Sequence, residues 1–217
     1  MSLARRLRPV ALVGCLVLGG CAAALQLATA EPPRLYELTP KSTFADGLPE
    51  VPGRLSVEVP TATAGLNSAR IALRPTPTTL EYYAGASWVD VVPVMVQNLL
   101  LESIDNTGRV DVLGREVVGV RADLALLTHI REFQAEYDTA GAPRVRVRLQ
   151  ARLIRLPRRT SLAATSEEAV VRARDTSLAA IIEAFDEAFG KAVKRIVEWT
   201  VAQAAAAQTP SADPRSI

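Results

Sequence analysis

The sequence predicts an α+β fold: a mainly antiparallel sheet with two principal helices packed on one face, including a long C-terminal helix. Two patterns carry this prediction. Residues 144–153 alternate between polar and apolar side chains, which is the period of a strand with one buried face. Residues 178–203 place apolar side chains three or four positions apart, which is the period of an amphipathic helix. Elements of these two kinds bury their apolar faces against each other in layers.

Short strands are expected in the first half of the folded region, because polar and apolar or β-branched residues alternate there. Pro60 ends the second of them, and a loop of small residues follows at 61–69. The segment Pro75-Thr76-Pro77 is expected to break the third strand before the fourth begins. The four expected strands are residues 34–38, 55–59, 70–74 and 79–83.

A first helix is predicted after Asp90, which is placed to cap it, with Pro93 tolerated in the first turn. Apolar residues recur along one face from Val92 to Leu100. The segment Asn106-Thr107-Gly108 is a helix stop, and a short strand is expected at 110–113.

A long hairpin follows. Its first strand, residues 124–137, switches its apolar phase, which predicts a bulge near residues 128–131. A turn at 138–143 leads to the regular strand at 144–153. The arginines of that strand are expected to pair with Glu132, Glu136 and Asp138 on a solvated sheet face; an anion site is the alternative. One more strand is expected at 166–172.

The C-terminal helix carries a single apolar stripe. We expect it to pack on the sheet; the alternative is a coiled-coil seam, which requires a homo-oligomer. The stripe consists of Leu178, Ile182, Phe185, Phe189, Ala192, Ile196 and Trp199.

The N-terminus has the features of a bacterial lipoprotein signal. Residues 1–8 are basic, and the next 12 residues are apolar, which is too short for a membrane span of about 20 residues. Leu18-Gly19-Gly20-Cys21 resembles a lipobox, in which small residues fit the peptidase and the Cys21 thiol takes the lipid. Leu12-Val13-Gly14-Cys15 has the same local form but leaves only six apolar residues before it, so we assign lipidation to Cys21.

Removal of residues 1–20 takes away three arginines, so 25 basic residues become 22 against 23 acidic residues. The resulting net charge of about −1 argues against a nucleic-acid partner, which would require an excess of basic residues. We expect a tether at residues 21–33 with a reach of about 45 Å, one domain at 34–203 and a disordered tail at 204–217. Ala22 follows the lipidated cysteine, where enteric inner-membrane lipoproteins carry Asp, and this favours the outer membrane.

Catalytic chemistry is not expected, because the chain has one histidine, His129, in the middle of a strand. Such a residue is typically structural. The sequence has no histidine pair for zinc, no nucleophile elbow and no glycine-rich phosphate loop. The prediction is therefore a protein that is not an enzyme, with no cofactor and no metal.

The stretch Leu80 to Asp90 gathers three of the few aromatic residues around a run of small ones. Adjacent Tyr82 and Tyr83 point to opposite faces of an extended segment, so only one of them enters the core. Trp88 is expected to staple the first turn of the helix. The small residues 84–87 are predicted to form an exposed loop, and we expect Tyr82, Tyr83 and Trp88 to supply the partner contact.

These segments together resemble the ABC-type transport auxiliary lipoproteins, of the paraquat-inducible protein C type. The resemblance is carried by Arg-Ile-Ala-Leu-Arg at 70–74, Leu-Glu-Tyr-Tyr at 80–83, Trp88, a helix with Pro93, Ile130-Arg131-Glu132-Phe133 and a late Trp199. Ser87 departs from relatives that carry a basic residue before the tryptophan, which puts a charge-based role of this segment in doubt.

The resemblance implies an accessory of an intermembrane lipid transport system, in which an inner-membrane ABC permease and ATPase work with an MCE-domain protein. The lipoprotein is expected at the outer membrane, anchored by lipid and facing the periplasm of a Gram-negative bacterium, as a docking or coupling component. The alternatives are a structural or assembly lipoprotein of an envelope complex and a periplasmic lipid carrier.

Overall fold

The computed structural model describes residues 32–114, 121–137 and 141–208. The chain divides into two units at residue 34. Apart from the first residue of its first strand, the sheet and both helices belong to the second unit, which begins at Leu35.

Within the described residues the chain forms nine strands and two helices, which confirms the α+β class. The elements are β1 (Arg34–Tyr36), β2 (Arg54–Val57), β3 (Thr61–Ala62), β4 (Arg70–Thr76), β5 (Thr79–Trp88), α2 (Val92–Asp105), β6 (Asp111–Leu113), β7 (Leu124–Glu136), β8 (Arg144–Arg155), β9 (Thr160–Arg172) and α3 (Leu178–Gln208).

Strand β7 is the centre of the sheet. Along one edge it pairs antiparallel with β8, which pairs antiparallel with β9. Along its other edge it pairs in parallel with β2, then β3, then β4, at Leu124, His129 and Ala135 respectively. β6 extends the sheet beyond β2, and β5 and β1 extend it beyond β4. The long hairpins make the sheet mostly antiparallel, as predicted.

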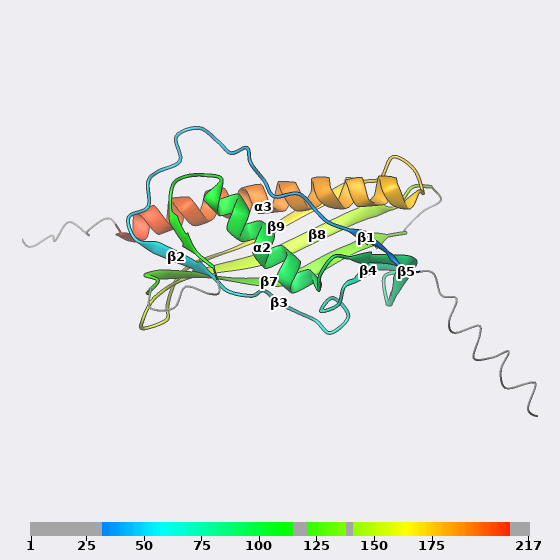
Figure 1. Ribbon diagram of the computed structural model, residues 1–217, viewed down its shortest axis with the longest axis horizontal. Helices are drawn as coiled ribbons and strands as arrows, with labels where there is room; N and C mark the ends of the chain where they lie inside the picture. The colour runs from blue at the N-terminus through cyan, green and yellow to red at the C-terminus, as the bar shows by residue number, and fades with distance from the viewer. Residues whose placement is uncertain (1–31, 115–120, 138–140, 209–217) are drawn as a thin grey trace, which may run out of the picture. The chain divides into compact units, whose positions relative to one another are not determined.

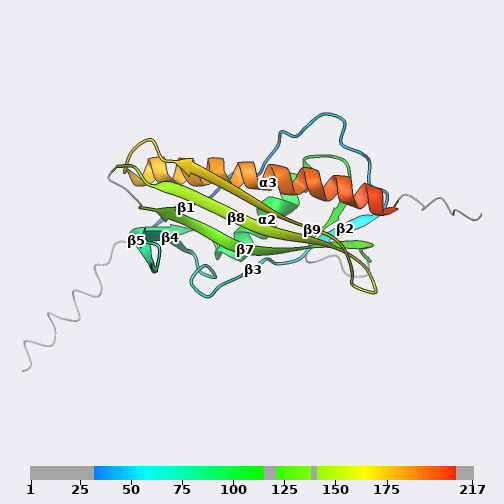
Figure 2. The same ribbon diagram turned by 180° about the vertical axis from the view of Figure 1, so that it is seen from behind.

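Both helices lie on the same side of the sheet (Figure 1). α3 packs against β8 and β9, whereas α2 packs against β2, β6 and α3. The view from behind shows β7, β8 and β9 in front of the helices, so the described helices leave this face uncovered (Figure 2).

The core forms between the apolar face of the sheet and the apolar face of α3. Val145, Val147 and Leu149 of β8 are fully buried, and so are Phe185 and Phe189 of α3. The ends of the helix stripe are half-buried: Leu178, Ile182 and Trp199. The stripe therefore packs within the chain, as expected.

The predicted bulge in β7 is confirmed. The β7–β8 register shifts between Ile130 and Glu132, so Arg131 is the extra residue. Before the bulge Leu124, Leu126 and Ile130 are buried, and after it the buried positions become Phe133 and Ala135. One inserted residue thus explains the change of apolar phase, because a strand exposes alternate residues on alternate faces.

The break expected in the segment 75–77 falls at Pro77, and Pro75 itself does not end the strand, because β4 continues to Thr76. Pro75 follows Arg74, the last residue of β4 that pairs with β7, and it lies in the stretch between Leu73 and Thr76 where the register with β5 is irregular. A proline without an N–H therefore interrupts no regular ladder there. The turn between the two strands consists of Pro77 and Thr78 alone.

The expected loop at residues 84–87 is also wrong, because β5 continues to Trp88. The register with β4 passes from Ala72 opposite Tyr82 to Arg70 opposite Ser87, so residues 83–86 oppose Ile71 alone. Gly85 has a φ of 65°, a conformation that favours glycine. The small residues thus form a wide bulge within a strand, and Ala84 and Gly85 are its exposed part.

Asp90 is not the N-cap of helix α2, because the helix begins one residue later than that prediction requires. Its N-cap is Val91, and the Asp90 carboxylate accepts a hydrogen bond from the Val91 N–H at 2.7 Å. Gln97 of this helix is buried and donates to the Val57 carbonyl at 2.7 Å, which fixes the helix to β2. The C-cap is Asn106, in the predicted stop.

Other element boundaries also differ from the sequence predictions. β9 begins at Thr160, six residues before the expected strand. β3 occupies two residues of the expected loop at 61–69. α3 extends to Gln208, so residues 204–208 belong to the helix rather than to the expected tail. Ala204 is fully buried, which explains why the helix continues there.

Candidate functional site

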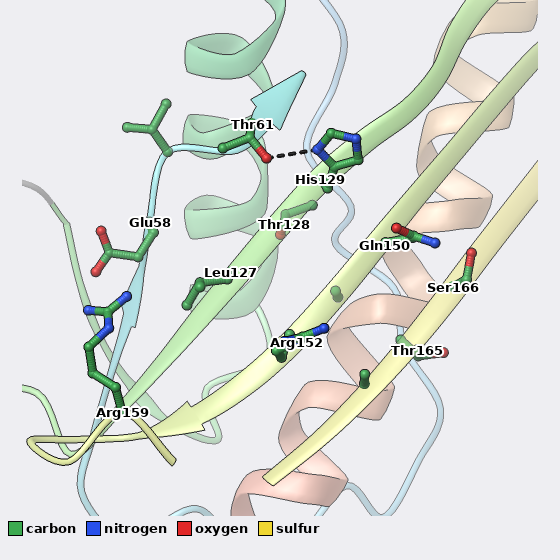
Figure 3. Close-up of a pocket in the computed structure, with 13 residues that line it drawn as sticks. Glu58, Thr61, Leu127, Thr128, His129, Gln150, Arg152, Arg159, Thr165 and Ser166 are labelled. Carbon is green, nitrogen blue, oxygen red and sulfur yellow. Dashed lines mark hydrogen bonds between the residues drawn. The ribbon is translucent and has the colours of Figure 1, made fainter. Parts of the chain in front are cut away.

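The uncovered face of the sheet holds a hollow of about 650 Å³. It lies over the first half of β7 and the strands paired with it, and Figure 3 shows both helices behind these strands. Glu58, in the segment between β2 and β3, and Thr61 of β3 line the rim, and the β8–β9 turn brings Arg159 to the same rim beside Glu58 (Figure 3).

Two rows of side chains cross the floor of the hollow. The strand registers align His129 of β7 with Gln150 of β8 and Ser166 of β9. The next row aligns Leu127, Arg152 and Ala164. On β7 and β8 these residues alternate with buried ones, and on β9 they alternate with half-buried ones, so the period that fills the core on one face places polar groups on the other.

The other half of the uncovered face is a network of ion pairs. Arg146 bonds Glu136 at 2.9 Å and also pairs with Glu168, while Arg148 bonds Glu132 at 2.9 Å. The hydrogen bond that Arg146 donates to Glu136, together with the negative charge of that carboxylate, raises the pKa of Arg146. The predicted pairing of the arginines with Glu132 and Glu136 is therefore confirmed. The expected partner Asp138 lies outside the described residues.

His129 has a partner in the fold. Its Nδ1 lies 2.8 Å from the Thr61 hydroxyl, which joins β7 to β3 (Figure 3). This bond agrees with the predicted structural role. Sequence reasoning missed that His129 also lines the hollow.

The expectation that only one of the two tyrosines enters the core is wrong, because Tyr82 and Tyr83 are both half-buried and both pack against the core. The Tyr82 hydroxyl donates to the Gly65 carbonyl at 3.0 Å, and the Arg70 guanidinium lies 3.6 Å from the centre of its ring. The Tyr83 hydroxyl lies 2.9 Å from that of Tyr137. Burial, then the hydrogen bond with Tyr137, raise the pKa of Tyr83 above its ordinary value.

Trp88 is a core residue, with 1% of its surface exposed. Its ring meets Phe133 and Phe185 edge-on, with centroids 5.9 and 5.2 Å apart. It therefore supports the fold from within the core and offers no surface for the partner contact that we also expected of it, while the expected staple on the first turn of the helix stays a prediction. Cys21 and the lipobox lie outside the described residues, so lipidation stays a prediction.

Sequence reasoning missed the hollow because its parts come from separate segments. The one available signal was the end of the arginine stripe. Arg152 faces Leu127 rather than a carboxylate on β7 once the bulge at Arg131 is counted.

The described residues contain no group of three or more His, Cys, Asp or Glu side chains placed to hold a metal ion. No helix in residues 32–114, 121–137 and 141–208 has the length and apolar character needed to cross a membrane.

The chain belongs to the family of ABC-type transport auxiliary lipoprotein components, whose model matches residues 36–197. The match spans the sheet from β1 to β9 and most of α3. The protein is thus of the class of auxiliary lipoprotein components of ABC-type transport.

Individual relatives agree with the fold. The chain is similar to the crystal structure of the protein XCC0632 from Xanthomonas campestris, described as DUF330, with 26% identity, a TM-score of 0.73, and coverage of 78% of this chain and 95% of that one. It is also similar in fold to the crystal structure of an uncharacterized protein, with 12% identity, a TM-score of 0.61 and coverage of 78% and 99%.

A curated relative is an uncharacterized protein, bll6063, from Bradyrhizobium diazoefficiens, with 28% identity over 166 residues. The alignment covers 76% of this chain, and the chain spans 44% of the length of that relative.

Proposed function

We propose that this protein is an outer-membrane lipoprotein accessory of an MCE-type ABC intermembrane lipid transport system. It would be anchored through Cys21, face the periplasm, and act by protein–protein contacts as a docking or coupling component. The observation that carries the proposal is the family match over residues 36–197, which describes an auxiliary lipoprotein of ABC-type transport. The signal and lipobox at residues 1–21 support the anchored state.

The bulge of β5 is our proposed contact with the MCE-domain protein. Ala84 and Gly85 are exposed there, and the flanking Tyr82 and Tyr83 are half-buried. Both tyrosines already have hydrogen-bond partners, so their rings are ordered before any partner arrives. Pre-ordered side chains lower the entropic cost of association, and tyrosine is frequent among residues that carry binding energy.

The test is site-specific photo-crosslinking in intact cells. A photoreactive amino acid replaces Ala84, because this residue is exposed and its side chain is small. The matched control replaces Glu187, an exposed residue of α3 on the helix-covered side. We expect a covalent adduct with the MCE-domain protein from position 84 only. Adducts from both positions, or from Glu187 alone, would exclude the bulge as the contact.

The wider proposal has a separate test, because it does not depend on which surface makes the contact. Purification of the acylated protein from mildly solubilised envelopes should recover the MCE-domain protein together with the permease and the ATPase. Recovery of an envelope complex without an ATPase would instead indicate a structural or assembly lipoprotein. Lipid retained stoichiometrically by the non-acylated chain would indicate a carrier.

A further inference from the structure

Two arginines face the hollow without a partner in the described part of the chain. Arg152 and Arg159 are both exposed, and neither forms an ion pair or a side-chain hydrogen bond there. The arginines beside them on the same face differ, because Arg146 and Arg148 are each bonded to glutamates. The hollow thus begins where the ion-pair network ends.

The strand registers explain why Arg152 is unpaired. Its neighbours across β7 and β9 are Leu127 and Ala164, which carry no charge. Arg148, four residues earlier on β8, has Glu132 and Glu168 in the corresponding places. Opposite charges across neighbouring strands stabilise a solvent-exposed sheet face. The row of Arg148 has such partners, and the row of Arg152 does not.

Arg159 reaches the hollow from a constrained backbone. Its φ is 53°, in the left-handed region, which residues other than glycine seldom adopt. Such conformations are frequent at ligand sites. Figure 3 shows the guanidinium directed toward Glu58 at the rim. Among the described residues, Glu58 is the one carboxylate that lines the hollow, against two guanidinium groups.

Neutral hydrogen-bonding groups complete the hollow. Gln150 and Ser166 lie in the row next to Arg152, and His129 lies beside them with its Nδ1 occupied by Thr61. The volume of about 650 Å³ falls in the range of small-molecule sites, roughly 300–1,000 Å³.

We propose that this hollow binds the phosphate group of a small anionic ligand, with Arg152 and Arg159 as its charged ligands. Guanidinium groups present paired N–H donors that match phosphate oxygens, and their bonds to phosphate are charge-assisted. Gln150 and Ser166 supply neutral donors beside them. The phosphate belongs either to a free phosphate or to a lipid headgroup. The inference depends only on residues of this chain and stands independently of the transport partners proposed above.

The test uses the full acylated chain in neutral detergent, titrated calorimetrically with inorganic phosphate and with glycerophosphoglycerol, the water-soluble headgroup of phosphatidylglycerol. We expect saturable binding with a dissociation constant of about 1 mM or tighter. Equal affinity for both probes assigns the site to phosphate alone. An affinity about tenfold higher for glycerophosphoglycerol assigns it to the headgroup.

Arg152→Gln and Arg159→Gln should each weaken binding about tenfold, the loss of one charge-assisted contact, and the double variant should abolish it. Both side chains are exposed, so the variants should keep the melting temperature of the parent. Arg174→Gln is the charge-matched control, because Arg174 is exposed and pairs with Glu183 away from the hollow. Absence of saturable binding, binding unchanged in the double variant, or tighter binding of an acidic peptide would each overturn the proposal.

Discussion

Substitution of Phe185 by alanine tests whether the C-terminal helix is held by the sheet or reserved for a partner. Phe185 lies midway along the apolar stripe of α3 and is fully buried. Its ring meets Trp88 edge-on at 5.2 Å and lies tilted against Phe133 at 5.5 Å between centroids. The same substitution therefore removes contacts to β5 and to β7 at once.

The magnitude follows from burial and from these ring contacts. Truncation of a buried phenylalanine to alanine costs about 3–5 kcal/mol, which combines lost transfer energy with a cavity. Each aromatic pair adds about 0.5–1.5 kcal/mol beyond its buried area. Since Phe185 loses two such pairs, we expect a loss in the upper part of the range, about 4–5 kcal/mol.

The assay is urea unfolding of a non-acylated Cys21→Ser chain, followed by far-UV circular dichroism. The free energy of unfolding should fall while the urea dependence stays unchanged, because the surface exposed on unfolding is nearly the same. Phe44→Ala is the matched control, since Phe44 is only partly buried against the core and should cost less. A loss below about 1 kcal/mol for Phe185→Ala would falsify the packing described here, because no fully buried phenylalanine behaves so.

Three further outcomes are expected. Cys21→Ser should abolish lipid labelling and leave unprocessed precursor while Cys15→Ser should not; normal labelling of the Cys21→Ser chain would move the anchor. Tyr83 stays protonated in the folded chain above the pH at which the unfolded chain ionises, near 10, because its pKa is raised. The stabilisation that this raised pKa gives to the folded chain is therefore complete below about pH 10 and is lost as the pH rises further. Tyr83→Phe should thus lessen the fall in unfolding free energy at alkaline pH; equal pH profiles of the variant and the parent would contradict this. Thr128→Val should raise the unfolding free energy by about 1 kcal/mol, because the buried Thr128 hydroxyl lacks a hydrogen-bond partner; unchanged urea midpoints would indicate that water satisfies it.

The elements predicted best are those in which one face is buried along the whole length. β8 alternates without interruption, and its apolar residues are the buried ones, from Val145 to Leu153. The bulge at Arg131 was predictable for the same reason, because a phase change within a half-buried strand requires one extra residue. An element that buries one face along its whole length therefore has a regular spacing of apolar residues, and this spacing can be recognised in the sequence.

The β4–β5 hairpin was predicted less well because short-range signals there compete with pairing. Pro75 and the small residues 84–87 suggest a break and a loop when taken locally. The structure tolerates Pro75 in an irregular stretch of the ladder and accommodates residues 83–86 opposite Ile71. Pairing resumes at Ser87, next to the buried Trp88. A distant core contact thus prolongs a strand that local composition would end.

The uncovered face of the sheet shows the converse limit. A solvated sheet face and a binding face have the same strand period, so periodicity cannot separate them. What separates them here is pairing across strands: Arg148 lies between Glu132 and Glu168, while Arg152 lies between Leu127 and Ala164. That difference depends on a one-residue bulge and on the register of two hairpins, and it appears only when the strands are aligned. Charged stripes on antiparallel sheets should therefore be interpreted row by row, because paired rows contribute to the sheet and unpaired rows are where a ligand can bind.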